Sequence, residues 1–305
     1  MIVCTEDEFM AIAHEFEYSK PRTLSEAVKT LAGYGGRARV LAGGTDLIGL
    51  MADDAVTPEA LVDIKGIAGL DAITFKDGVL AIGALATFSN LRDSTVIAKR
   101  FPVIREMAGW VASTGVRNRA TMVGNICSAV PCCDSGPILL VYDAVVLVAG
   151  PKGKRKIKLA DWFLGARKTA LKTGEIVTGV ALPLPPKKHG ACFVKLGRYS
   201  GEDLAQASVT ILAMAGKCYR IAFGSVAPRP LRASRIEALL AGKVLSPTLI
   251  EEAVRLLPQE ISPITDIRST KECRAHMVGV MLERGLLAAV SRINGNGPEY
   301  GKSLI

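Results

Sequence analysis

The chain has 305 residues, a length that favours two or three domains over one small core. Hydrophobic residues make up 49% and charged residues 22%, and no apolar run approaches the roughly 18 residues of a membrane span. The net charge of +9 is concentrated in residues 183–305, which hold 17 Lys and Arg against 10 Asp and Glu. These basic residues are scattered, without interleaved aromatic residues. We therefore expect a solvated face or contact with an acidic partner subunit, and no nucleic acid.

The cysteines and the N-terminus indicate the compartment. Seven cysteines form no CxxC pair and are odd in number, which predicts reduced thiols in a cytoplasmic protein. The first residues are acidic and lack a basic segment, so no signal peptide is predicted.

Up to about residue 62, predicted strands and helices alternate. "EFEYSKP" is typical of a strand that ends at Pro21, and "TLSEAVKTLAGYGG" of a helix in which Thr23 and Glu26 fit a capping box. "ARVLAG" predicts the next strand, "DLIGLMA" a helix and "ALVDI" another short strand. Together these elements predict a small α/β unit.

The following stretch, to about residue 182, is richer in predicted strands. "DAITFKDGVLAIGALAT" predicts a hairpin with Asp77 and Gly78 at its turn. Helices are expected in "FSNLRDS", "FPVIREMAGWVAS" and "DWFLGARK", and a strand in "EIVTGVALP". A polar, glycine-bearing stretch precedes the apolar "ILLVYDAVVLVAG".

A proline-rich linker at Pro183, Pro185 and Pro186 separates the last part. Three antiparallel strands are predicted in "ACFVKLGR", "ASVTILAMA" and "YRIAFGSVA". Helices follow in "RIEALLAG", "SPTLIEEAVRLL" and "TKECRAHMVGVMLERGLLAAVSRI".

Two loops combine bare backbone with short hydrogen-bonding side chains. In "VLAGGTDL", Gly43 and Gly44 follow a predicted buried strand and precede Thr45 and Asp46. In "RATMVGNICSAVPCCD", Gly124 lies between two hydroxyl residues, Thr121 and Ser128. Such loops either form plain polar turns or present backbone N–H groups to a phosphate. Neither loop matches G-x-G-x-x-G or a Walker A motif, so spacing alone leaves both interpretations open.

Five motifs in order resolve the choice by resemblance. They are "AGGTDL", "GVRNRATMVGNICSAVPCCDSGPILLVYDAVVL", "GEIVTGVALP", "APRPLRASRIEALLAGK" and "ISPITDIRSTKECRAHMVGVMLERGL". Together they resemble the FAD-binding medium subunit of the molybdenum hydroxylases, the xanthine dehydrogenase and carbon monoxide dehydrogenase family. The resemblance covers about residues 15–292.

The resemblance implies an α+β fold class. It would be a PCMH-type FAD-binding fold of two α/β subdomains, with a C-terminal domain of a three-stranded antiparallel sheet and a helical bundle. The expected parts are an N-terminal extension (residues 1–14), FAD-binding subdomain 1 (15–62), FAD-binding subdomain 2 (63–182) and a carbon monoxide dehydrogenase flavoprotein-like domain (183–305).

The resemblance also implies which residues bind FAD. The first glycine loop would hold the pyrophosphate with Ala42, Gly43, Gly44, Thr45, Asp46 and Leu47. The second loop would contribute Thr121, Met122, Val123, Gly124 and Asn125, although relatives usually have glycine where Val123 stands. Ser128 would contact the cofactor and Asp134 would bind its ribose end. Val111 and Val177 would lie near the flavin ring, with Lys195 on its other side.

Other residues give weaker signals. Cys127, Cys132 and Cys133 cluster, but no fourth ligand is evident and adjacent cysteines rarely bind one metal well, so we expect buried or partly buried thiols and no metal site. The three histidines share no motif and are expected to be structural or on the surface. No catalytic residue is predicted. Arg198 and Tyr199 follow Lys195 in a loop that is either structural or edges the flavin.

Three functions are weighed. The first is an oxidoreductase's FAD-carrying electron-transfer subunit within a heterotrimer, receiving electrons from an iron–sulphur [2Fe–2S] subunit of a complex that also holds a molybdopterin subunit. Its external acceptor is undetermined, and NAD is one candidate. The alternatives are a free-standing FAD-dependent oxidase and a non-enzymatic nucleotide-binding scaffold. The motif "ISPITDIRSTKECR" favours the first.

Overall fold

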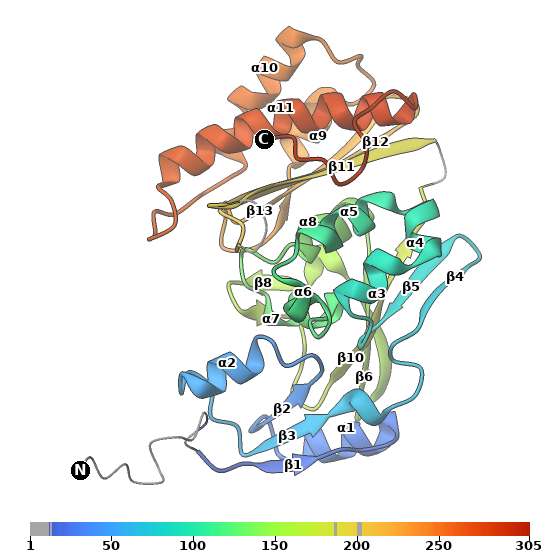
Figure 1. Ribbon diagram of the computed structural model, residues 1–305, viewed down its shortest axis with the longest axis vertical. Coiled ribbons are helices and arrows are strands. Elements are labelled where there is room, and N and C mark those ends of the chain that lie inside the picture. Colours follow the sequence, from blue (N-terminus) through green and yellow to red (C-terminus); the bar gives the residue numbers. More distant parts are fainter. Residues whose placement is uncertain (1–11, 13, 186–187, 200–202) are drawn as a thin grey trace.

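The computed structural model describes residues 12, 14–185, 188–199 and 203–305. Most of the predicted N-terminal extension lies outside these residues. Three parts are stacked along the long axis, from the N-terminal sheet at one end to the C-terminal helices at the other (Figure 1). No helix within the described ranges is long and apolar enough to cross a membrane.

The N-terminal part is a three-stranded parallel sheet with two helices. Its strands lie in the order β1, β3, β2, and α1 connects β1 to β2. The elements are β1 (Glu17–Ser19), α1 (Leu24–Gly33), β2 (Ala38–Leu41), α2 (Leu47–Ala52) and β3 (Ala60–Asp63). The capping box predicted at Thr23 and Glu26 is present at the start of α1.

The middle part is a five-stranded antiparallel sheet in the order β4, β5, β10, β6, β7. Its strands are β4 (Ile73–Lys76), β5 (Val79–Gly83), β6 (Val145–Gly150), β7 (Gly153–Lys158) and β10 (Ile176–Pro183). The predicted hairpin is confirmed. Asp77 and Gly78 both have positive φ, 50° and 75°, as a tight two-residue turn requires.

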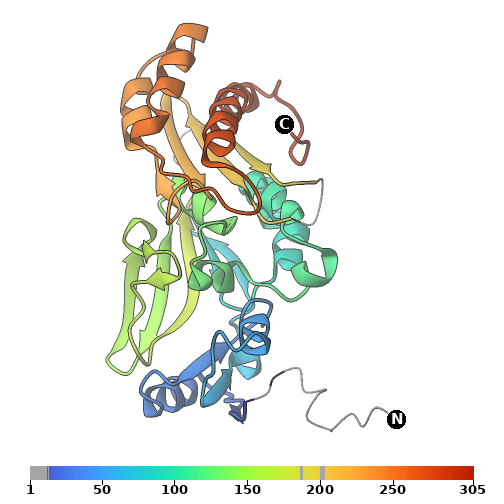
Figure 2. The same ribbon diagram turned by 90° about the vertical axis from the view of Figure 1, so that its left-hand side faces the viewer.

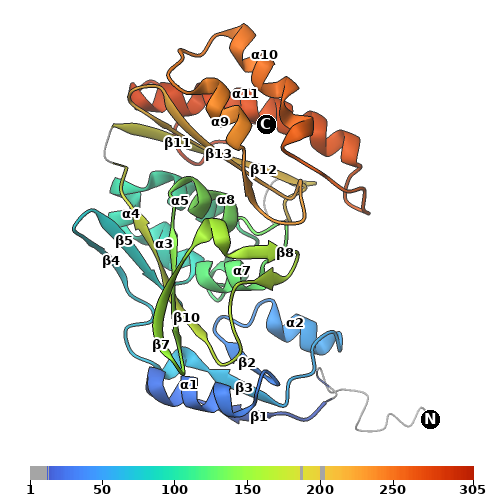
Figure 3. The same ribbon diagram turned by 180° about the vertical axis from the view of Figure 1, so that it is seen from behind.

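A run of short helices connects β5 to β6 and packs beside this sheet, as Figure 3 shows from behind. These are α3 (Phe88–Asp93), α4 (Thr95–Arg100), α5 (Pro102–Trp110), α6 (Thr114–Arg117), α7 (Met122–Ser128) and α8 (Ser135–Val141). Residues 121–125, expected to form a loop, are therefore the capped beginning of a helix. Thr121 is its N-cap.

The prediction of a helix in "DWFLGARK" is wrong. The segment forms the short turn η3 (Leu159–Asp161) and a small hairpin of β8 (Phe163–Gly165) and β9 (Lys168–Thr169). Tertiary contacts override the local propensity. Trp162 is fully buried and donates its indole N–H to the carbonyl of Ile126, and Arg167 turns the chain with φ 56°.

The C-terminal part is an antiparallel sheet covered by helices, and Figure 2 shows it at the top of the molecule. Its elements are β11 (His189–Leu196), β12 (Ala207–Met214), β13 (Cys218–Gly224), β14 (Leu231–Arg232), α9 (Ser234–Leu240), α10 (Pro247–Arg255) and α11 (Lys271–Ile293). The three predicted strands are confirmed, and the two-residue β14 adds a fourth at the edge. Two further short turns are η2 (Ile64–Gly66) and η4 (Leu257–Gln259).

Strand β12 is buried on both faces because the C-terminal sheet lies between two layers. Ile211 and its odd-numbered neighbours pack under the C-terminal helices, whereas Leu212 belongs to the core shared with the middle part. This alternation joins the C-terminal sheet to α5 and α8 of the middle part. The sheet can therefore deliver side chains into the middle part.

Candidate functional site

One cavity of about 980 Å³ lies where the three parts meet. Fifteen of the sixteen residues predicted from the resemblance line it. The exception is Met122, whose side chain is fully buried in the core. A volume of this size is at the upper end of the range for small-molecule and cofactor sites.

The first glycine loop carries the chain from β2 into α2 along one wall of the cavity. Gly44 has φ +80°, a conformation that a side chain disfavours. The first backbone bond of this turn runs from the N–H of Ile48 to the carbonyl of Gly44, at 2.9 Å. The N–H groups of Thr45, Asp46 and Leu47 precede that bond, and N–H groups at a helix start have no intrahelical partner.

Gly43 has a steric role that the sequence did not indicate. A Cβ at this position would lie 2.0 Å from the carbonyl oxygen of Arg119. The first loop therefore packs directly on the backbone that leads into the second. Glycine at position 43 is required for this loop-to-loop contact before any ligand is considered.

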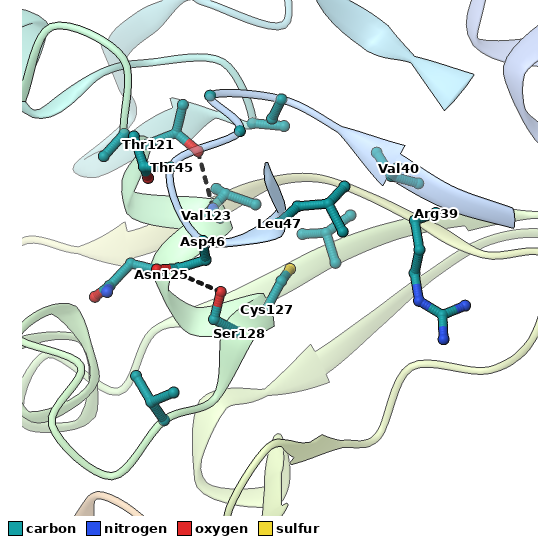
Figure 4. Close-up of a pocket in the computed structure, with 18 of the residues that line it drawn as sticks. Arg39, Val40, Thr45, Asp46, Leu47, Thr121, Val123, Asn125, Cys127 and Ser128 are labelled. Carbon is teal, nitrogen blue, oxygen red and sulfur yellow. Dashed lines mark hydrogen bonds between the residues drawn. The ribbon is translucent and has the colours of Figure 1, made fainter. Parts of the chain in front are cut away.

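The second glycine segment begins α7 and lies against the first loop. The hydroxyl of Thr121 accepts the N–H of Gly124 at 2.9 Å. The side-chain oxygen of Asn125 accepts the N–H of Ser135, at 3.1 Å. Ser128 donates a hydrogen bond to the carboxylate of Asp46, which joins the two segments directly (Figure 4).

A buried ion pair closes another side of the cavity. Lys195, from β11, donates to the Oδ2 of Asp134 at 2.7 Å and to the carbonyl of Trp110 at 3.0 Å. Both side chains are less than a tenth exposed. The Oδ1 of Asp134 is buried without a hydrogen-bond partner among the described residues. Burial raises the pKa of Asp134, and the charge of Lys195 opposes this effect.

This geometry bears on two of the sequence expectations. Asp134 was expected at the ribose end of the cofactor and Lys195 beside the flavin ring. The structure places the two groups in direct contact, so both address the same part of the cavity. A ligand that touches one of them lies beside the other.

The loop after α5 carries a site feature that sequence reasoning missed. Val111, Ala112 and Ser113 line the cavity, and Ala112 has φ +38°, which is rare for a residue with a side chain. Arg117 donates to the carbonyls of Val111 and Ala112 and holds this conformation. An alanine gives no local signal for positive φ, so the sequence offered no way to find it.

Further lining residues come from outside the predicted motifs. Arg39 and Val40 extend along the cavity from β2, on the opposite side of Figure 4 from Asn125. Thr173 and Gly174 come from the turn before β10, and Leu204 from the C-terminal part. The glycine in "KTGE" was the available signal for that turn, because Gly174 has φ +76°.

The clustered cysteines belong to the cavity wall. Cys127 and Cys132 line the cavity, and Cys133 is buried behind it. Burial raises the pKa of Cys127 to about 12 and also raises that of Cys133, so both thiols stay protonated. Within the described part of the chain, no group of three or more His, Cys, Asp or Glu side chains is placed to hold a metal ion.

Comparisons with known proteins agree with this arrangement. The family model "FAD binding domain in molybdopterin dehydrogenase" matches residues 14–185, and "CO dehydrogenase flavoprotein C-terminal domain" matches residues 193–289. The carbon monoxide dehydrogenase medium chain of Afipia carboxidovorans is 34% identical over 92% of this chain and 99% of its own. The xanthine dehydrogenase FAD-binding subunit of Escherichia coli is 29% identical over 91% and 97%. A solved carbon monoxide dehydrogenase structure from Hydrogenophaga pseudoflava superposes with a TM-score of 0.88 at 32% identity, covering 92% of this chain and 98% of that one.

Proposed function

Since this chain belongs to the FAD-binding medium subunits of the molybdenum hydroxylase family, we propose that it passes electrons from [2Fe–2S] clusters on a partner subunit to an external acceptor. It binds FAD and is a subunit of an oxidoreductase. The observation that carries the proposal is the single cavity shared by all three parts, with two glycine-bearing helix starts and a buried ion pair in its walls.

The residues in the cavity fit this cofactor. Pyrophosphate oxygens need several N–H donors that no Cβ obstructs, and the adjacent starts of α2 and α7 would supply them. The unpartnered Oδ1 of Asp134 needs a donor, and the hydroxyl and ring N–H groups of FAD are donors. Val111 and Val177 provide apolar walls for the ring.

The protein orients the cofactor and sets its electrostatic environment. When bound, FAD would supply a two-electron carrier whose reduction takes up protons and whose reoxidation releases them, while the residues of the cavity hold and orient it. Asp134 and Lys195 form a pair without net charge, so the chain would hold the ring beside a neutral dipole. The thiol of Cys127 in the wall and that of Cys133 behind it stay protonated and add no charge.

The partners follow from the relatives. These are named as a medium chain and an FAD-binding subunit. We propose a heterotrimer with an iron–sulphur [2Fe–2S] subunit and a molybdopterin subunit, with NAD as one candidate acceptor. The match of the C-terminal family model favours this assignment over a free-standing oxidase. The free thiols among the described residues support a reducing, cytoplasmic compartment.

The cofactor assignment is tested by analysing the flavin released on denaturation, which should be one non-covalent FAD per chain. Gly44→Ala should lower the FAD content of the folded chain, because Gly44 has φ +80° at the cavity wall. Gly49→Ala is the matched control. It lies in α2, a Cβ there meets nothing within 4 Å, and alanine favours the helix. Equal FAD content in the two variants would contradict the placement of the first glycine loop.

The division of labour has its own test. Anaerobically, the isolated chain with FAD should be reduced by dithionite and reoxidised by a dye, and it should hydroxylate no substrate. Hydroxylation by the lone wild-type chain would overturn the proposal that this chain is the electron-transfer subunit.

A further inference from the structure

Two backbone N–H groups in the cavity wall have no acceptor among the residues that the structure describes. They belong to Ala112 and Ser113, in the short loop between α5 and α6. Both residues are half-buried and line the cavity. Backbone N–H groups that are removed from water nearly always find an acceptor. A ligand in this cavity that covers the loop must therefore bring acceptor atoms for these two donors.

The guanidinium of Arg117 determines where the two donors point. Its Nη1 donates to the carbonyl of Val111 at 2.8 Å and also to the carbonyl of Ala112. In a trans peptide the N–H points away from the carbonyl oxygen of the same peptide unit. The N–H groups of Ala112 and Ser113 therefore point away from Arg117. Because both donor residues line the cavity and Arg117 does not, we place the donors on the cavity side of the loop.

Side chains hold this loop in a conformation that its own sequence does not favour. Ala112 has φ +38°, which residues with a side chain seldom adopt. Arg117 also donates from Nη2 to the hydroxyl of Thr114 at 2.8 Å, and Lys195 donates to the carbonyl of Trp110 at 3.0 Å. Two cations thus bind the three consecutive carbonyls of residues 110–112. This fixes the peptide planes, and with them the directions of both N–H groups.

The surroundings of the loop suit one part of FAD better than the others. Val111 and Val177 are buried apolar walls of the cavity, which suit an aromatic ring and disfavour a phosphate. A flavin ring carries two carbonyl oxygens along one edge, and both accept hydrogen bonds. We propose that the N–H groups of Ala112 and Ser113 bind this carbonyl edge, with Arg117 as their positioning residue. The inference rests on the proposed function, which places the ring against these walls.

Donors in this position tune the flavin as well as orient it. The negative charge of a reduced flavin lies mainly on its carbonyl edge. Fixed N–H dipoles aimed at that edge stabilise the reduced form more than the oxidised form, because they are already oriented where the charge develops. They therefore raise the reduction potential, and this contribution is separate from that of the pair formed by Asp134 and Lys195.

The test compares the FAD-loaded wild-type chain with Arg117→Met, in which both carbonyls lose their donor. Anaerobic titration against reference dyes should show the equilibrium constant for reduction lowered about tenfold, which is about 30 mV for a two-electron couple. Infrared spectra of the bound flavin should show its carbonyl bands at higher wavenumber, because hydrogen bonds to a carbonyl lower its stretching frequency. A purely structural role of Arg117 would leave these bands in place.

Further variants separate the loop conformation from the charge of Arg117. Arg117→Met/Ala112→Gly should recover most of both changes, because glycine adopts positive φ without a side-chain penalty. Arg117→Lys keeps the charge without the planar fork, so it should lie between wild type and Arg117→Met, and it replaces the latter if that variant folds poorly. Arg119→Met is the matched control, because it removes an exposed arginine whose side chain has no described partner. Its equilibrium constant should stay within about twofold of wild type.

The outcomes distinguish this inference from the proposed function. Wild-type potential and carbonyl bands in FAD-loaded Arg117→Met would overturn the inference and leave the proposed function standing. The same holds if Arg117→Met/Ala112→Gly stays as low as Arg117→Met, because the charge of the arginine would then explain the shift. If the wild-type chain retains no FAD, the proposed function falls and the inference falls with it.

Discussion

Two buried ion pairs join the middle part of the molecule to the C-terminal part, and they differ in what they leave unsatisfied. Glu106 and Arg292 form one pair at 2.9 Å, and Asp134 and Lys195 form the other at 2.7 Å. The carboxylate of Glu106 also accepts the N–H groups of Phe193 and Gly301. Asp134 has an oxygen with no partner among the described residues, and that residue faces the cavity.

The arginine of the first pair is equally well satisfied. Its guanidinium also donates to the carbonyls of Ala191 and Pro298 and lies 3.8 Å from the centre of the Tyr300 ring. This pair is a completed structural contact that fastens the C-terminal tail and α11 to α5. The comparison indicates that burial alone does not mark a functional charge. An unsatisfied acceptor on a residue that lines a cavity is the better indication.

The largest effect is expected from breaking the completed pair. Arg292→Met leaves Glu106 buried without its counter-ion and should lower the free energy of unfolding by about 3–5 kcal/mol. FAD content per folded chain should not change, because neither residue lines the cavity. The measurements are denaturant unfolding and flavin analysis.

Two further variants make this test specific. Glu106→Gln/Arg292→Met should recover much of the loss, because a neutral amide still accepts the backbone N–H groups. Arg255→Met is the control, since its pair with Glu251 is exposed on both sides and should contribute almost nothing. A loss of FAD in Arg292→Met would show that the Glu106–Arg292 pair also supports cofactor binding, so the two pairs would not differ in function.

The cavity pair should instead show its largest effect on the flavin. Lys195→Met leaves the charge of Asp134 beside the ring, so the flavin should keep its site but become harder to reduce. The expected lowering is some tens of millivolts, with about 30 mV corresponding to about 1.4 kcal/mol for a two-electron couple. Stability should fall by about 1–3 kcal/mol, the cost of leaving a buried acceptor without its partner, which is less than for Arg292→Met.

The double variant shows whether the change in reduction potential comes from the charge of the pair or from the shape of its side chains. Lys195→Met/Asp134→Asn carries no charge and should return the potential close to the wild-type value, measured by anaerobic titration at constant pH. An unchanged reduction potential in Lys195→Met would show that this ion pair does not lie beside the flavin ring.

A third ion pair, Asp266 and Arg274, differs from the first two because only its cation is fully buried. The pH dependence of stability can therefore be compared among the pairs. Hydrogen bonds from Arg268, with the charge of Arg274, lower the pKa of Asp266. A carboxylate with a lowered pKa stabilises the fold above its unfolded pKa of about 3.9, and this stabilisation is lost as the pH falls below that value. Burial has the opposite effect on Asp134, whose raised pKa makes its contribution less favourable as the pH rises.

Asp266→Asn should therefore cost about 1–3 kcal/mol near neutral pH, since it leaves Arg274 buried with weaker acceptors. The difference from wild type should shrink as the pH falls below about 4. Urea midpoints between pH 3 and 7 measure this. A difference that stayed constant across the range would mean that the charge of Asp266 does not stabilise the fold.

The smallest effect on the flavin is expected at the uncharged cavity wall. Val123 lies in the first turn of α7, where the relatives implied by the resemblance usually have glycine. Val123→Gly should keep FAD and cost about 2–3 kcal/mol of stability, because it removes a buried side chain and places glycine in a helix. Val123→Ala removes most of the side chain without the added backbone freedom of glycine, so it separates these two contributions to stability. Loss of FAD in both would show that this protein uses the valine itself to hold the cofactor.

Local signals in the sequence predicted much of the fold. The capping box at Thr23 and Glu26, the Asp77–Gly78 turn and the apolar periodicities depend on neighbours a few residues apart, and all appear in the structure. The helix predicted at "DWFLGARK" failed because Trp162 binds a carbonyl 36 residues away. Contacts at that separation leave no periodic trace in the sequence.

The same distinction between local signals and long-range contacts applies to the site. The sequence by itself determined which segments bear the bare backbone and short donors, because glycine, threonine and serine carry those properties locally. Only the tertiary structure decided that Gly43 packs on Arg119, that Ala112 adopts positive φ, and that Lys195 meets Asp134, 61 residues away. These features exist only once three parts of the chain enclose one cavity, since each part supplies a wall that the others lack.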